Sequence, residues 1–342
     1  MLFVLASAGA LRFAGGVECS FGGHPFQPLH LHLTMSVRLA IKVDVDTDRG
    51  TREGVPPLAA VLKDAGCPAT FLFSLGPDNT GKAIRRVFRP GFLKKIGRTN
   101  VAGNYGLRTL LSGTVLPAVR IAQRNEGVLR AVRDQGFAVG IHCWDHFAWQ
   151  DYLASWDFAK TRAEFSQAAA EFERIFGAKP RTAGTPGWQA NANSLRVYDE
   201  FKLLYGSDTR GPHPFFPRIG EETFRTLQIP TTLPTLDELL GRPEYPPEKI
   251  IPHYRELLTE APDEYVHVLT IHAELEGQRY LDLFKQLLAE AKKASIEFVQ
   301  LETIAENLLR DPAAIPVCDV QAREIDGRTG TLAVQGAPVF CG

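Results

Sequence analysis

The chain has 342 residues, of which 44% are hydrophobic and 23% are charged, and its formal net charge is −1. This composition supplies enough apolar side chains for a large folded core, and it excludes a chain that is disordered throughout. The five cysteines are odd in number and widely spaced, without a CxxC pair, which argues against both a disulfide framework and a structural zinc site.

The first 35 residues differ from the rest of the chain. Residues 1–10 are apolar like the centre of a signal peptide, but they lack its positively charged opening. Residues 11–34 are rich in Gly, His and Pro and show no helix or strand period. We therefore interpret residues 1–34 as an upstream extension, with Met35 as the biological start; an export signal is the alternative. The chain lacks an apolar run of the ~20 residues that a membrane-spanning helix needs.

From Val37 the chain alternates strand-like and helix-like segments. We expect strands at residues 37–43, 69–73, 137–141, 182–184, 203–206, 227–232, 267–271 and 296–301, and helices at 54–65, 159–176, 193–201 and 278–294. Such repeated strand–helix units predict a parallel sheet. Residues 36–309 are the predicted folded domain. The sequence beyond them is polar and Gly-rich without a period, so we expect residues 310–342 to be a loosely attached tail.

Side chains that bind metals follow three of the predicted strands. Asp44 and Asp46 come after the first strand, His142 and His146 after the third, and His272 after the seventh. Only a closed or nearly closed barrel brings these strand ends together simply, so we predict an α/β barrel with its polar groups on one rim. Two histidines with one carboxylate leave positions open for water and substrate, as in a catalytic metal site.

Each part of this pattern also has a plainer interpretation. A pair of histidines four residues apart is common on helix surfaces. Asp44 and Asp46 could be a solvated strand end, or the metal–nucleotide motif of a glycosyltransferase. The glycosyltransferase interpretation leaves His142, His146 and His272 without a function, whereas a metal-dependent hydrolase uses all five side chains.

The order of these motifs resembles that of the polysaccharide deacetylase family, whose catalytic region is a NodB-homology domain. The resemblance implies a distorted (β/α) barrel of about seven parallel strands that holds a divalent metal ion, whether Zn, Mn, Co or Fe. Asp44 matches the family's general base and Asp46 a metal ligand, while His142 and His146 match the other two ligands. His272 matches the general acid.

The third and fourth family motifs are matched less evenly. Asp208, in the segment 207–211, matches the aspartate of the fourth motif and is therefore a predicted catalytic residue. The third motif normally reads Arg-x-Pro-x-Gly, but residues 183–188 contain no arginine. That arginine orients the catalytic aspartate in the family. We therefore predict that Arg210 takes over this task for Asp44.

Two further residues near the motifs are predicted to contact substrate. Trp188 follows the third motif, and aromatic faces stack on sugar rings. Glu274 follows His272 and could bind the sugar amine or orient that histidine. Packing in the core is the alternative for Trp188, and a solvated loop is the alternative for Glu274.

Five longer segments sharpen the resemblance: residues 44–56, 73–79, 142–150, 228–235 and 270–277. They are similar to the branch of the family that removes the formyl group from 4-deoxy-4-formamido-L-arabinose linked to undecaprenyl phosphate, a step of lipid A modification in polymyxin resistance. The resemblance implies a hydrolase of amide C–N bonds, peripheral at the cytoplasmic face of the inner membrane. The alternatives are an N-deacetylase of peptidoglycan or chitin, and a barrel that only binds lipid or sugar.

The segment of residues 79–125 is a long insertion between the second and third strands. It contains ten basic residues, among them Arg85, Arg86 and Arg89, and no acidic residue. Basic side chains interleaved with apolar ones are typical of a surface that lies on anionic lipid. The high apolar content favours lipid over nucleic acid. We predict that the three arginines contact the phosphate of a lipid-linked sugar.

Overall fold

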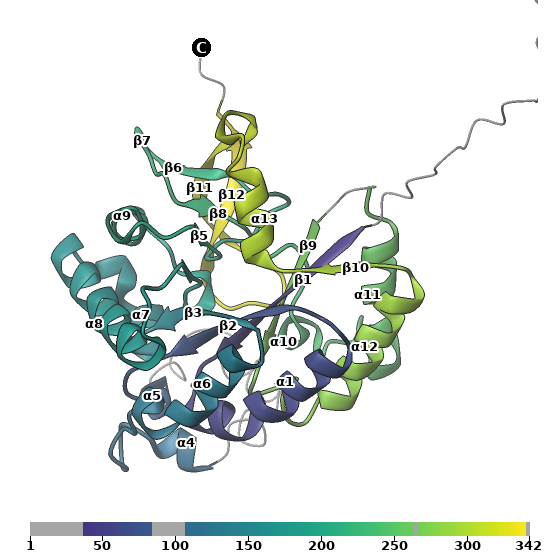
Figure 1. The fold of residues 1–342 in the computed structure, drawn as a ribbon, viewed down its shortest axis with the longest axis horizontal. Helices are drawn as coiled ribbons and strands as arrows, with labels where there is room; N and C mark the ends of the chain where they lie inside the picture. Colours follow the sequence, from purple (N-terminus) through teal and green to yellow (C-terminus); the bar gives the residue numbers. More distant parts are fainter. Residues whose placement is uncertain (1–36, 84–106, 263–265, 340–342) are drawn as a thin grey trace, which may run out of the picture. The chain divides into compact units, whose positions relative to one another are not determined.

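A parallel sheet forms the centre of the fold in the computed structural model, which describes residues 37–83, 107–262 and 266–339 (Figure 1). Its strands are β1 (Arg38–Val45), β2 (Ala69–Ser74), β3 (Ala138–Cys143), β4 (Thr182–Ala183), β5 (Tyr205–Gly206), β8 (Leu227–Gln228), β9 (Val266–His272) and β10 (Glu297–Val299). They run in the order β10-β1-β2-β3-β4-β5-β8, with β9 also paired to β1, and all these pairings are parallel.

The sheet curves into the predicted distorted barrel. Past β8, the backbone N–H groups of Thr232 and Leu233 donate hydrogen bonds to the carbonyl oxygen of Val268 on β9, at 3.1 and 3.2 Å. These bonds link the last strand of the series to the neighbour of β1. The α/β barrel predicted from the sequence is therefore confirmed.

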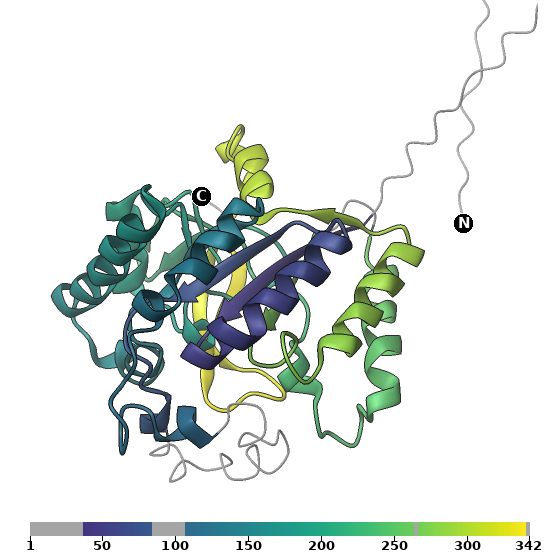
Figure 2. The same ribbon diagram turned by 60° about the horizontal axis from the view of Figure 1, so that its bottom comes forward.

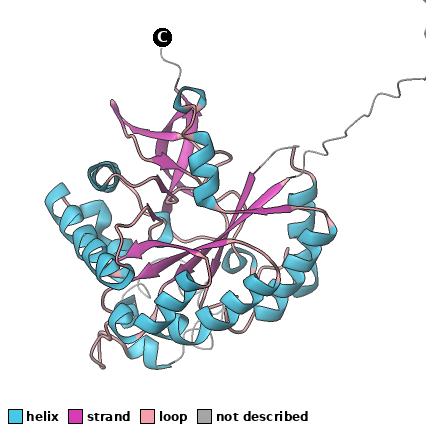
Figure 3. Cartoon of the chain, viewed as in Figure 1, coloured by secondary structure: helices cyan, strands magenta, loops and turns pink. Residues whose placement is uncertain are grey.

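Helices cover the outside of this sheet, and α12, α1, α6 and α8 follow one another along it (Figures 2 and 3). The helices are α1 (Val55–Asp64), α4 (Leu107–Leu111), α5 (Ile121–Arg124), α6 (Glu126–Asp134), α7 (His146–Tyr152), α8 (Phe158–Phe176), α9 (Ala192–Phe201), α10 (Leu236–Leu239), α11 (Pro247–Thr259), α12 (Leu281–Lys293) and α13 (Leu301–Leu308). A π-helical turn, η1 (Gly50–Gly54), leads into α1. Among the described residues, no helix is both long enough and apolar enough to cross a membrane.

The alternation of residues along β1 gives the barrel two different surfaces. Leu39, Ile41 and Val43 belong to the large apolar core that includes the helices. Ala40 faces the other way, into a smaller cluster with residues of β5, β8 and β9. Because successive strand residues point to opposite faces, Lys42 shares the inner face with Ala40. The inner face of β1 therefore carries both an apolar residue, Ala40, and a buried polar one, Lys42.

The C-terminal residues form part of a second sheet, which corrects the expectation of a loosely attached tail. The strands β11 (Val317–Glu324) and β12 (Thr331–Pro338) pair antiparallel, and β11 joins β6 (Phe216–Ile219), which pairs with β7 (Glu222–Thr223). β12 also exchanges backbone hydrogen bonds with Arg210, at 2.9 and 2.8 Å. The expectation failed because backbone hydrogen bonds between strands hold this hairpin in place. A polar sequence without a clear period gives no sign of such pairing.

Candidate metal centre and catalytic site

The three predicted metal ligands come from the ends of two strands. Asp46 directly follows β1, and His142 is the next-to-last residue of β3. His146 is the first residue of α7, which begins there because the Asp145 side chain accepts a hydrogen bond from the backbone N–H of Ala148 at 3.0 Å. The two histidines therefore share no helix: the strand end positions one and the capped helix start positions the other.

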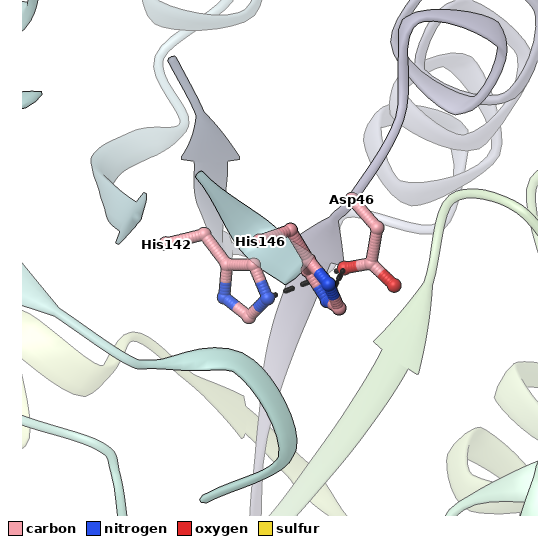
Figure 4. A group of neighbouring side chains, drawn as sticks. All are labelled: Asp46, His142 and His146. Carbon is pink, nitrogen blue, oxygen red and sulfur yellow. Dashed lines mark ion pairs between the residues drawn. The ribbon is translucent and has the colours of Figure 1, made fainter. Parts of the chain in front are cut away.

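The structure brings the three side chains together (Figure 4). Asp46 Oδ1 lies 3.2 Å from His142 Nε2 and 3.4 Å from His146 Nε2. The candidate ligand atoms of the three residues all lie within 4.8 Å of one another. The side chains converge from separate segments, as the sequence predicted.

The protonation pattern also suits a cation. His142 Nδ1 lies 2.5 Å from the carbonyl oxygen of Gly184 and donates to it, so Nε2 is the nitrogen that faces Asp46. Burial raises the pKa of Asp46, but His146 and His142 outweigh this effect and hold the pKa well below its ordinary value. The carboxylate is therefore ionised.

These residues fit a divalent ion. Asp46 Oδ1 is buried and has no hydrogen-bond partner among the described residues. Buried carboxylate oxygens are ordinarily hydrogen-bonded or bound to a cation. Two imidazole nitrogens and one carboxylate oxygen are a donor set for transition metals such as zinc, iron or manganese.

The predicted base and acid lie on neighbouring strands beside these ligands. Asp44 on β1 is in register with His272 on β9, so both side chains point to the same face of the sheet. Asp44 Oδ1 and His272 Nδ1 have no hydrogen-bond partner among the described residues. Asp44 Oδ1 lies 3.9 Å from His142 Nδ1. The predicted catalytic pair and the predicted ligands therefore share one end of the barrel.

The prediction that Arg210 orients Asp44 is wrong. Arg210 pairs instead with Glu238, with 2.6 Å between Nη1 and Oε1, and donates to the carbonyl oxygen of Leu233 at 3.0 Å. The cation beside Asp44 is Lys42, whose Nζ lies 3.7 Å from Asp44 Oδ2. Sequence reasoning missed Lys42 because a lysine in a strand is ordinarily exposed. Its position two residues before Asp44, on the same face, was the available signal.

Asp208, a predicted catalytic residue, is hydrogen-bonded to the loop after β4. The carboxylate is buried and accepts hydrogen bonds from Thr185 N (2.7 Å), Tyr198 Oη (2.9 Å) and Gln228 Nε2 (3.1 Å). Burial raises the pKa of Asp208, and these hydrogen bonds oppose the rise. Thr185 follows Gly184, whose carbonyl fixes His142, so Asp208 holds the loop that orients a candidate ligand.

Glu274 holds the segment that carries Asp46. Its Oε1 accepts hydrogen bonds from Asp46 N (3.1 Å), Thr47 N (2.9 Å) and Thr47 Oγ1 (2.8 Å), and the residue is 1% exposed. A Cβ atom at Gly50 would lie 1.8 Å from Glu274 Oε1, so only glycine permits this approach. We therefore correct the substrate-binding prediction for Glu274: the side chain is enclosed and holds the segment of the candidate ligand Asp46.

Trp188 is packed behind the site rather than open to a sugar. It is 2% exposed, and its indole N–H donates to Thr231 Oγ1 at 3.1 Å. The guanidinium carbons of Arg328 and Arg210 lie 4.5 and 5.1 Å from its ring centroid. The predicted stacking of Trp188 on a sugar is therefore corrected, because cations already occupy the space against the ring.

Part of the basic insertion can be placed. Arg124 pairs with Asp48 at 3.1 Å, and Arg120 lies 5.0 Å from the ring centroid of Trp144. These contacts place the end of the insertion beside the loops that carry Asp46 and His146. The three predicted phosphate contacts, Arg85, Arg86 and Arg89, lie outside the described residues and stay predictions.

Comparison with known proteins finds the same family that the sequence motifs resemble. A model of the polysaccharide deacetylase family matches residues 43–206. The chain is 33% identical to the probable 4-deoxy-4-formamido-L-arabinose-phosphoundecaprenol deformylase of Shewanella sediminis, over 88% of this chain and 96% of that protein. It is also 33% identical to the protein of the same name from Wigglesworthia glossinidia brevipalpis, over 84% and 98% of the two chains.

A solved structure supports the fold independently. The crystal structure of a probable polysaccharide deacetylase from Pseudomonas aeruginosa PAO1 superposes with a TM-score of 0.55 at 17% identity, covering 80% of this chain and 91% of that one. At this identity the likeness establishes a common architecture.

Proposed function

We propose a specific reaction for this chain on the premise that it belongs to the polysaccharide deacetylase family and is a hydrolase of amide C–N bonds. The reaction is removal of the formyl group from 4-deoxy-4-formamido-L-arabinose linked to undecaprenyl phosphate, which yields formate and the free sugar amine. A divalent metal ion held by Asp46, His142 and His146 is the cofactor. The assignment to lipid A modification rests on the names of the two deformylase relatives.

The observation that carries this proposal is the convergence of five side chains at one end of the barrel. Asp46, His142 and His146 present their ligand atoms to one another, and Asp44 and His272 stand beside them in register on β1 and β9. Amide hydrolysis requires a base for water and an acid for the departing amine. This arrangement offers both, next to candidate ligands for a Lewis acid.

The chain's own residues divide the proton transfers. Asp44 accepts a proton from the attacking water while the oxygen of that water bonds to the formyl carbon. His272 donates a proton to the sugar nitrogen as the C–N bond breaks, so that the amine leaves neutral and formic acid remains, which loses its proton to water to give formate. The divalent ion supplies positive charge that makes water more acidic and polarises the amide carbonyl. Glu274 and Asp208 keep the ligands in place during these transfers.

A formate-release assay tests the reaction. Purified protein is given the formamido-arabinose lipid before chelation, after chelation, and after a single metal (Zn, Mn, Co or Fe) is restored. We expect formate release that chelation abolishes and one of the metals restores. The N-acetyl analogue is the matched control for the alternative deacetylase activity. Release of acetate in place of formate, or turnover that survives complete chelation, contradicts the proposal.

We further propose that the protein works peripherally at the cytoplasmic face of the inner membrane, where its lipid-linked substrate would be. The insertion of residues 79–125 combines ten basic residues with apolar ones. In its described part, Val115 is 76% exposed and Leu116 is 37% exposed. Apolar side chains beside basic charge favour binding to anionic lipid, at roughly 1 kcal/mol per basic residue near the surface.

Neutralising Arg85, Arg86 and Arg89 together tests the membrane proposal. We expect weaker binding to anionic liposomes and slower turnover of the lipid-linked substrate, because the charges that face the lipid are lost. Turnover of a soluble formamido sugar should survive. Equal loss on both substrates, or unchanged liposome binding, contradicts the membrane role of these residues.

A further inference from the structure

Lys42 is a buried cation to which the proposed proton transfers assign no task. It lies on β1 two positions before Asp44, and its side chain is 0% exposed. Alternate residues of a strand face the same side, so both side chains point into the barrel. Lys42 Nζ donates a hydrogen bond to the carbonyl oxygen of Ser207 at 2.9 Å and lies 3.7 Å from Asp44 Oδ2.

The burial of this ammonium group requires an explanation. A buried charge is unfavourable unless it is paired and hydrogen-bonded, and an unbranched apolar side chain would fill the same space without that cost. Burial lowers the pKa of Lys42, and the nearby carboxylates of Asp44 and Asp208 offset this effect only in part. The contacts of Nζ with the Ser207 carbonyl oxygen and the Asp44 carboxylate are what compensate the burial of the charge.

Other cations near the site are engaged elsewhere. Arg210 and Arg328 both pair with Glu238, at 2.6 and 2.8 Å. Within the described ranges, the ion-pair contacts of Asp44 are with Lys42 and His142. His142 Nδ1 is held by the Gly184 carbonyl, so Lys42 is the cationic side chain that lies beside Oδ2 of the Asp44 carboxylate.

Gly184 leaves the space that Lys42 uses. A Cβ atom built on Gly184 would lie 2.5 Å from Leu72 Cδ1, 3.0 Å from the Ser207 carbonyl oxygen and 3.5 Å from Lys42 Nζ. Any side chain at position 184 would therefore compete with the end of the lysine and its hydrogen-bond acceptor. Position 184 is also the one at which the third family motif, Arg-x-Pro-x-Gly, has its arginine. In this chain a lysine on β1, Lys42, supplies the positive charge in place of an arginine after β4.

We propose that Lys42 is the positioning residue of Asp44: it fixes Oδ2 of the carboxylate, so that Oδ1 is directed at the water to be activated. Oδ1 has no hydrogen-bond partner among the described residues, which leaves it available for this proton. The inference rests on the proposed function, because it takes Asp44 as the general base. Lys42 itself touches no reacting atom.

Kinetics of three variants separate the charge from the volume of this side chain. Lys42→Met removes the charge, and we expect kcat to fall about 100-fold at unchanged metal content, since misplacing a reacting group by about 1 Å has this effect. In Lys42→Ala we expect a similar fall in kcat. Added propylammonium should raise the kcat of this variant at least tenfold, whereas neutral propanol should not. The matched control is Thr70→Val, at the position paired with Lys42 on β2, which should keep wild-type kcat.

Crystal structures of wild type and Lys42→Met give a readout that needs no turnover. We expect the Asp44 carboxylate to rotate from its wild-type orientation in the variant while Asp46, His142 and His146 stay in place. An unchanged carboxylate, wild-type kcat in Lys42→Met, or equal rescue by propanol overturns the role of Lys42. A wild-type protein that releases no formate counts instead against the proposed function, and the carboxylate orientation still decides the role of Lys42.

Discussion

The two sides of the barrel are built by different means. On one side, β1, β2, β3 and β9 are strands of six to eight residues, and their pairings shift register once, between Phe73 and Ser74. The candidate ligands and the predicted acid and base lie on these strands or within three residues of their ends. On the other side, β4, β5 and β8 have two residues each. There, buried polar side chains hold the structure together, chiefly the Asp208 hydrogen bonds and the Arg210–Glu238–Arg328 cluster.

The long-strand side therefore carries the predicted reacting groups, and the short-strand side carries the buried polar network that stabilises the fold. Long strands fix the direction of each side chain at their ends, so a few residues suffice to assemble reacting groups. Short strands provide little backbone pairing, and a buried ionic network has to supply the rest. We expect changes on the long-strand side to reduce turnover at nearly constant stability, and changes on the short-strand side to do the reverse.

The largest expected effect is on the long-strand side. Replacing His272 with glutamine removes the predicted proton donor to the amine, and we expect kcat to fall about 1000-fold. The backbone bond from His272 N to Glu276 Oε2 (2.9 Å) remains, so the urea midpoint should be nearly unchanged. A variant within tenfold of wild-type kcat would remove His272 from the mechanism.

The converse experiment is on the short-strand side. Arg210→Met leaves the buried carboxylate of Glu238 with one partner fewer, and we expect a loss of about 3 kcal/mol in the free energy of unfolding. Turnover of the folded fraction should change less than tenfold, as seen by urea titration and kinetics in parallel. Arg181→Met is the control, because Arg181, itself exposed, pairs at the surface with Glu302 and Glu306. Intact stability with lost turnover would restore the original prediction for Arg210.

Acid should lower the free energy of unfolding through His267, a buried histidine on the long strand β9. Burial lowers the pKa of His267 on β9 to about 4, from 6.5. Between these values the unfolded chain binds a proton that the folded chain does not, so stability is present above pH 6.5 and is lost as the pH falls toward 4. We expect this loss to be on the order of 3 kcal/mol and His267→Gln to flatten it in urea titrations. An acid limb of unchanged slope in the variant would exclude His267 as its source.

The smallest expected effect concerns a single support. Tyr198→Phe deletes one of the hydrogen bonds to Asp208 and should lower the free energy of unfolding by about 1 kcal/mol. The loop bond from Thr185 N remains, so kcat should stay within about threefold of wild type. A larger fall in kcat at unchanged stability would place Asp208 in the chemistry, as the sequence predicted.

The same division explains what the sequence could predict. β1, β2, β3 and β9 are apolar runs, so their positions and the ligands that follow them, Asp46 and His142, could be recognised locally. The pairing of Arg210 and Arg328 with Glu238 could not be predicted, because these three residues are distant from one another in the sequence. The burial of Lys42 and the pairing of the C-terminal strands depend on contacts of the same long-range kind.

The most direct test of the account is the position of a bound metal. Crystals of the purified protein, loaded with one divalent transition metal, are measured on both sides of that metal's absorption edge. We predict one strong anomalous peak bounded by Asp46 Oδ1, His142 Nε2 and His146 Nε2, and its loss in Asp46→Ala. A peak at another place, or none at this rim in a protein that still hydrolyses its substrate, would contradict the account.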